Sequence, residues 1–121
     1  WERQEIENYR ITTAFLSLGS DITVTVVVRD GQVAEHECAP EPTENNSGCE
    51  QARKNPARYT VPGLFAELRQ LHRDAQRSTA YLTPYQAIGY SYHSELGYPK
   101  QIAWNPPEYT KWTVKSFERL P

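Results

Sequence analysis

The pair of residues with the most chemical potential is His93 and Glu95, which stand two positions apart beside Tyr92. A histidine next to a carboxylate can act as a general base, because the carboxylate orients the ring and stabilises its protonated form. The same residues also suit an ordinary solvated turn in which neither does chemistry. His93 and Glu95 are therefore only weak candidates for catalysis, and the prediction leans against an enzyme.

A metal site is the second chemistry to consider, at His36 between Glu35 and Glu37. Imidazole and carboxylate groups can collect a divalent cation, but a charged edge strand has the same composition. The sequence contains no phosphate-binding glycine-rich loop, no nucleophile elbow and no His-Glu-x-x-His motif. We therefore predict neither a metal nor a cofactor.

The two cysteines, Cys38 and Cys49, lie in one segment rich in Pro, Glu, Asn and Ser. In an oxidising compartment they would form a disulfide that closes a loop and contributes about 2 to 3 kcal/mol of stability. A metal site would need further ligands, of which only His36 is near, and a catalytic thiol would need a histidine and a lowered pKa. We predict the disulfide.

Aromatic residues gather in the last third of the chain. Tyrosine and tryptophan that stay half exposed supply contact area with a polar tip, which suits a protein or glycan surface. Cross-strand packing in a thin sheet would explain the same residues. The predicted binding residues are Tyr90, Tyr92, Tyr98 and Trp104.

These aromatic residues belong to a predicted β-hairpin over residues 90–105, around which the chain is organised. Gly97 can take the positive φ of a turn, and Pro99 fits only the beginning or the edge of a strand. Apolar residues alternate on each side of the turn, so each strand can turn one face inward. The inward residues are Ile88, Tyr90, Tyr92, Tyr98, Ile102 and Trp104.

The pattern of apolar residues in the N-terminal half predicts a short helix over Trp1–Asn8. Three strands are then predicted, from Tyr9, from Ile22 and from Val33 to Cys38. Asp30-Gly31 predicts a tight hairpin turn between the last two. A two-residue turn would place Val26 and Val24 opposite Glu35 and Glu37. Either a bulge shifts this register, or the returning strand is an edge whose charges discourage association, and we favour the edge.

The segment Ala39–Arg58 lacks apolar periodicity and predicts a long loop. Thr60 then opens the one clear helix, with Pro62 in its first turn. Charged residues take its other face, and a last strand follows the Pro106-Pro107 turn, with Trp112, Val114 and Phe117 as its apolar residues. The apolar face of the helix carries Leu64, Phe65, Leu68, Leu71, His72 and Ala75.

Together these elements predict a single α+β domain over residues 1–121: an antiparallel sheet of about five to six strands, one main helix on one face, and the short N-terminal helix. The formal net charge of -2, from 13 basic and 15 acidic residues, excludes a basic footprint for nucleic acid. No apolar run is long enough to cross a membrane.

The same ordering resembles a family of small bacterial exported or lipid-anchored proteins of unassigned function. This resemblance implies an envelope location and a sheet with one helix, and it brings no catalytic residues. It covers nearly the whole chain. Its motifs here are Trp1 with Asn8-Tyr9, Asp30-Gly31-Gln32-Val33, Thr60-Val61-Pro62-Gly63-Leu64-Phe65, and Leu96 to Ile102 with its Gly-Tyr-Pro.

The chain begins at Trp1 and contains no methionine, which we interpret as the mature part of a secreted protein or lipoprotein, although an artificial boundary would look the same. We therefore expect a monomeric, non-catalytic domain of the cell envelope or exterior that binds another protein or a glycan through its aromatic hairpin. A small hydrolase-like or metal-dependent enzyme is the second hypothesis. The third is a secreted enzyme inhibitor that presents the Asp30-Gly31 or the Glu95-Leu96-Gly97 turn.

Overall fold

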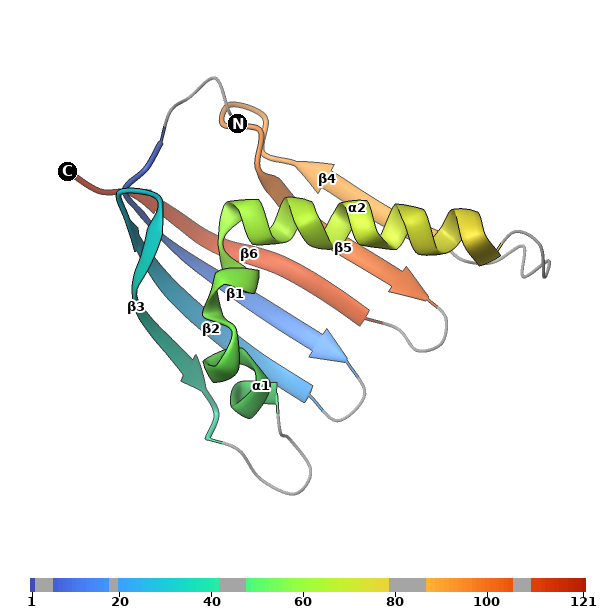
Figure 1. Cartoon of the computed structure of the whole chain (residues 1–121), viewed down its shortest axis with the longest axis horizontal. Helices are drawn as coiled ribbons and strands as arrows, with labels where there is room; N and C mark the ends of the chain where they lie inside the picture. Colours follow the sequence, from blue (N-terminus) through green and yellow to red (C-terminus); the bar gives the residue numbers. More distant parts are fainter. Residues whose placement is uncertain (2–5, 18–19, 42–47, 79–86, 106–109) are drawn as a thin grey trace.

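One antiparallel sheet of six strands, in the order β3-β2-β1-β6-β5-β4, is the framework of the computed structural model, which describes residues 1, 6–17, 20–41, 48–78, 87–105 and 110–121 (Figure 1). All its helical elements lie on one face of the sheet. The predicted α+β class, with one main helix on one face, is therefore confirmed. The strands are β1 Tyr9–Ser17, β2 Ser20–Arg29, β3 Gln32–Ala39, β4 Ala87–Tyr92, β5 Pro99–Asn105 and β6 Thr110–Arg119, and the helices are α1 Gly48–Lys54, the 3₁₀ helix η2 Pro56–Tyr59 and α2 Val61–Ser78.

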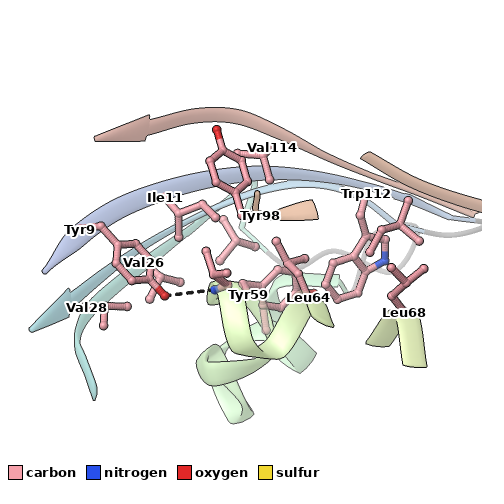
Figure 2. Close-up of a cluster of buried hydrophobic side chains, with 14 of the residues drawn as sticks. Tyr9, Ile11, Val26, Val28, Tyr59, Leu64, Leu68, Tyr98, Trp112 and Val114 are labelled. Atoms are coloured by element: carbon pink, nitrogen blue, oxygen red, sulfur yellow. Dashed lines mark hydrogen bonds between the residues drawn. The ribbon is translucent and has the colours of Figure 1, made fainter. Parts of the chain in front are cut away.

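Alternation of apolar and polar residues along most of β1 and β2 explains why these strands form the centre of the core. Side chains of one parity point to the helical layer, and each buried Val or Ile stabilises the fold by about 1.5 to 3 kcal/mol. Figure 2 shows several of them facing the helices. The buried residues of the two strands on this face are Tyr9, Ile11, Thr13, Ile22, Val24, Val26 and Val28.

The β2–β3 hairpin combines both solutions to the register problem. Asp30 and Gly31 have positive φ angles of 51° and 77°, as a tight hairpin turn requires. Beyond the turn a register shift between Val27 and Val28 places Val26 opposite His36 instead of Glu35. β3 is also an edge strand, as predicted. The bulge thus moves Glu35 from Val26 to Val27, whose side chain points to the opposite face of the sheet, and the edge position exposes Glu35 to water.

The prediction of an N-terminal helix is wrong for the residues of this segment that the structure describes. Ile6 and Glu7 are not helical, and residues 2–5 lie outside the described residues. Instead, the Trp1 ring makes edge contacts with Tyr9 and Phe117, both at 5.6 Å between ring centroids. Burial against the sheet, and not helical amphipathicity, therefore explains the apolar residues at this end of the chain.

The predicted loop over Ala39–Arg58 contains two short helices, α1 and η2, which is the second correction. Helices this short are unstable alone and depend on tertiary packing. Here Cys49, Ala52 and Tyr59 are all buried, at 0%, 3% and 2% exposure. Residues 42–47 of the predicted loop lie outside the described residues.

The predicted disulfide between Cys38 and Cys49 is confirmed, and it ties the end of β3 to α1. Closing this short loop is expected to stabilise the fold by about 2 to 3 kcal/mol, chiefly by constraining the unfolded chain. The double variant Cys38→Ser/Cys49→Ser should lose that amount in urea unfolding. Reduction of the native protein serves as the control and should give the same loss. An unchanged unfolding midpoint would contradict the prediction.

Helix α2 begins after Thr60, as predicted, and its first turn is anchored to the sheet. The Thr60 hydroxyl accepts a hydrogen bond from the Gly63 N–H at 3.2 Å, which is an N-cap interaction. The Tyr9 hydroxyl accepts one from the buried Val61 N–H at 3.1 Å (dashed line in Figure 2). Leu64 is buried one turn further on. Strand β1 therefore fixes where the helix starts.

Three buried tyrosines predict a loss of stability at alkaline pH. Burial raises the pKa of Tyr9, Tyr59 and Tyr98 above its ordinary value of 10.0. Above about pH 10 the unfolded chain loses these protons while the folded protein keeps them, so the free energy of unfolding falls as pH rises. The expected slope is up to about 1.4 kcal/mol per pH unit for each tyrosine.

Urea unfolding at pH 8, 10 and 11 measures this slope directly. The stability due to these tyrosines should be fully present at pH 8 and should decrease above pH 10. Tyr98→Phe is the control, because a phenyl ring has no proton to lose, so this variant should show a shallower slope. A free energy of unfolding that stays constant from pH 8 to 11 would contradict the prediction.

Candidate functional site

The His93–Glu95 turn is a structural unit. The N–H groups of Glu95 and Leu96 donate hydrogen bonds to His93 Nδ1 at 3.3 and 3.1 Å, and the His93 ring stacks on Tyr98 at 4.9 Å. A neutral ring that accepts at Nδ1 carries its proton on Nε2, so neither nitrogen can serve as a base without disturbing the turn. The contacts of His93 therefore explain it as the residue that organises the hairpin turn.

The position of His36 in the sheet separates its side chain from the two neighbouring carboxylates that could have shared a cation with it. His36 pairs with Val26, whereas Glu35 and Glu37 pair with the neighbouring residues of β2. Successive side chains of a strand point to opposite faces, so the imidazole and the carboxylates diverge. Among the residues that the structure describes, no group of three His, Cys, Asp or Glu side chains could hold a metal ion.

Both predicted inhibitor turns are held by contacts with other parts of the chain. In the first turn, the Gly31 N–H donates to the Glu7 carbonyl oxygen at 3.0 Å, and the Asp30 N–H donates to Asn8 Oδ1 at 3.0 Å. In the second, a Cβ added at Gly97 would lie 2.9 Å from the Trp1 nitrogen. These contacts give both turns a structural role, and inhibition of an enzyme stays a prediction.

The four predicted binding aromatics separate into two groups. Tyr98 is 5% exposed and stacks on Phe117 at 4.8 Å, and Trp104 is half-buried against the core. Tyr90 and Tyr92, in contrast, are 48% and 46% exposed. Only Tyr90 and Tyr92 are thus available to a partner, while Tyr98 supports the turn from inside.

Tyr90 and Tyr92 do not stand alone on β4, because α2 brings two further rings beside them. Phe65 stacks with Tyr92 at 6.2 Å between centroids, and His72 meets Tyr90 edge to face at 5.4 Å. The two tyrosines contact each other at 5.7 Å. We call Phe65, His72, Tyr90 and Tyr92 the α2–β4 aromatic row. It forms a continuous line of rings where the helix meets the edge of the sheet.

The helical repeat explains how α2 supplies its part of this row. Phe65 and His72 are seven residues apart, which is two helical turns, so they lie on the same side of the helix. Leu64 and Leu68 are buried against the sheet on the adjacent side. Phe65 and His72 therefore lie at the border between the buried and the exposed faces, next to β4.

A basic side chain accompanies the aromatic row. Arg69 stands four residues after Phe65 and three before His72, and side chains at these spacings are neighbours on a helix. It is exposed. The row is therefore an aromatic surface with the positive charge of Arg69 at its border, where an acidic group of a partner could be accommodated.

The sequence did not identify Phe65, Arg69 or His72 as site residues. Sequence periodicity places Phe65 on the apolar face of the helix and His72 at the edge of that face, and in the structure Phe65 is partly buried and His72 is exposed. The signal that could have found them is their position at the edge of that face, where side chains are only partly covered.

Comparison with known proteins adds one finding. The sequence model of one family, described as "Family of unknown function (DUF6174)", matches residues 1–110. No curated protein and no solved structure matches the chain.

Proposed function

The chain belongs to the DUF6174 family, whose function is unknown, and we propose that it is a non-catalytic domain that binds another protein through the α2–β4 aromatic row. The observation that carries this proposal is the exposure of Tyr90 and Tyr92, at 48% and 46%, within a line of four contacting rings. Half-exposed tyrosines combine a large apolar area with a hydroxyl group and lose little entropy on binding.

The arrangement of the rings favours binding over catalysis. Each ring of the row is held by a neighbour, so the surface is formed before a partner arrives and little ordering is needed on binding. The best acid-base candidate, His93, uses its Nδ1 atom within its own turn. A catalytic site would instead bring a base, a nucleophile or an electrophile together around one reacting atom.

We propose further that the protein acts in the cell envelope or outside the cell. The Cys38–Cys49 disulfide supports this location, because disulfides persist in oxidising compartments and are rare in the cytosol. Among the described residues, no helix is long and apolar enough to cross a membrane. The partner should then be sought among exported or envelope proteins.

Replacement of Tyr90 and Tyr92 by serine tests the proposal. The double variant should weaken binding of the partner about 100-fold, because exposed tyrosines at an interface each contribute about 1 to 2 kcal/mol. Quantitative affinity capture from envelope and culture fractions identifies candidate partners, and titration with each purified candidate then measures the change in Kd. Thermal unfolding shows that the variant is folded.

Leu16→Ser provides the matched control. Leu16 is a large apolar residue of similar exposure, at 44%, and it lies on β1 away from the aromatic row. A partner of the row should bind this variant as it binds the native protein. If every captured protein binds the native chain and both variants with equal affinity, the proposed function is wrong.

A further inference from the structure

The backbone of β4 lies at one edge of the sheet formed by the described strands, beside the aromatic row. Among the described strands β4 has one neighbour, β5. The His93 N–H donates to the Tyr98 carbonyl oxygen at 2.9 Å, so this N–H points toward β5. Because N–H groups alternate in direction along a strand, those of Tyr90 and Tyr92 point to the free edge, and those of Gly89 and Ser91 point to β5. A partner could therefore form backbone hydrogen bonds with Tyr90 and Tyr92.

The two edge strands of the sheet, β3 and β4, differ in how well they are protected against pairing with a strand of another protein. β3 carries Glu35 and Glu37 together with a bulge, which are two devices that prevent an edge from pairing with another strand. β4, Ala-Ile-Gly-Tyr-Ser-Tyr, contains no charged residue and no proline, and the register shift in its pairing with β5 places the extra residue, Lys100, in β5 and not in β4. A Cβ added at Gly89 would meet no atom within 4 Å, so the face of β4 opposite the aromatic row is uncovered there. The sequence thus protects one edge and leaves the other able to pair.

The charges on α2 indicate which kind of strand can pair with the edge of β4. In a symmetric pairing of two copies through β4, the two α2 helices would flank the junction on one face of the sheet. This arrangement would bring the exposed Arg69 and Arg73 of both copies together, and like charges oppose it. A strand from a different protein avoids this repulsion, and an acidic residue in it would be attracted to Arg69.

We propose that β4 receives an extended segment of a partner protein as an additional strand of the sheet. The segment places apolar side chains on the aromatic row and an acidic side chain toward Arg69, while its backbone bonds to Tyr90 and Tyr92. This inference rests on the proposed function, because it specifies how the row is used. Recognition by strand addition obtains affinity from the main chain and specificity from alternate side chains.

The test uses a displayed library of random 12-residue peptides, selected on the intact protein. Peptides that bind should show alternating apolar positions with Asp or Glu among them, and should lack proline in the middle. A synthetic selected peptide is then titrated while amide hydrogen exchange is followed by NMR. Exchange at Tyr90 and Tyr92 should slow at least tenfold, whereas Ser91, which already bonds within the hairpin, should change little.

Two protein variants test the contribution of charge, and N-methylated peptides test that of the backbone. Arg69→Gln should weaken an acidic peptide at least tenfold, and Gln70→Glu, which changes the net charge by the same one unit at the neighbouring exposed position, is the control for charge alone. N-methylation along the peptide should abolish binding at alternate positions only, because alternate N–H groups point to β4.

The outcomes distinguish this inference from the proposed function. Selected peptides could bind only when the Tyr90 and Tyr92 side chains are present and yet leave the amides of both residues unprotected from exchange. This result would overturn strand addition and would keep the aromatic row as a binding surface. Protection of these amides that rises with protein concentration, without peptide, would show a second copy at the edge and would also overturn it. A selection that yields no peptide dependent on Tyr90 and Tyr92 counts against both.

Discussion

Trp112→Ala is expected to lower the free energy of unfolding by about 3 to 5 kcal/mol, the usual cost of removing a buried tryptophan. Trp112 is 1% exposed and its ring stacks on Tyr59 at 5.0 Å, with Phe15 edge-on at 5.2 Å. Arg58 lies over the same ring, with its Cζ atom 4.8 Å from the centroid. The substitution would therefore leave a cavity and release η2 from β6.

Urea unfolding measures this loss, and Trp112→Phe is the matched control. The Trp112 Nε1 atom is buried without a hydrogen-bond partner among the described residues, so the indole N–H contributes nothing that a phenyl ring lacks. The phenylalanine variant should thus retain most of the stability, because it keeps an aromatic ring against Tyr59. A similar small loss for both variants would contradict the packing described here.

Gly63→Ala is expected to destabilise the protein by about 2 to 4 kcal/mol, although alanine is the better helix former. A Cβ at this position would lie 2.3 Å from the Ala57 carbonyl oxygen and 2.5 Å from that of Arg58. Both are backbone atoms of η2, so relief of the overlap requires a movement of the whole turn. Glycine is therefore needed here for close approach between η2 and α2.

The sign of the effect makes this prediction specific. In an exposed helix position the same substitution would stabilise by about 1 kcal/mol, and Ala66→Gly, on the exposed side of α2, should cost about that amount. Chemical unfolding of both variants gives the comparison. If Gly63→Ala leaves stability unchanged or raises it, η2 and α2 are not in the close contact described.

The elements with strong local patterns could be predicted from the sequence. Alternation from Tyr9 and from Ile22, the Asp30-Gly31 turn and the cap at Thr60 each carry a local signal that the structure follows. These signals agree with the global fold because alternation places the same side chains in the core. The preferred edge position of β3 followed from its charges by the same reasoning.

The parts that could not be predicted depend on contacts between distant residues. Nothing near Cys49 or Tyr59 in sequence indicates a helix, since both short helices are stabilised by burial against the sheet. The burial of Tyr98 is a similar case, because its partners, Phe117 and Trp1, lie far from it in the sequence. Its alternation with exposed residues gave no indication of how deep it lies.

The residues of the candidate site could likewise be predicted from the sequence only in part. The hairpin pattern identified Tyr90 and Tyr92 as aromatic residues near a turn, but their exposure follows from the edge position of β4. The pairing of these tyrosines with Phe65 and His72 follows from the path of α2 across the sheet (Figure 1). Sequence periodicity places residues on one face of a helix and does not say which strand that face meets.

Site-specific photo-crosslinking shows whether the α2–β4 aromatic row contacts a partner protein in the cell. The photoreactive amino acid p-benzoylphenylalanine is incorporated at position 92 in one protein and at position 16 in another, and both are expressed in the organism that makes the protein. We expect a crosslink to one defined protein from position 92, reduced by Tyr90→Ser in the same chain, and none to that protein from position 16. Equal crosslinking from both positions, or a specific crosslink from position 16 alone, would show that the aromatic row is not the binding surface.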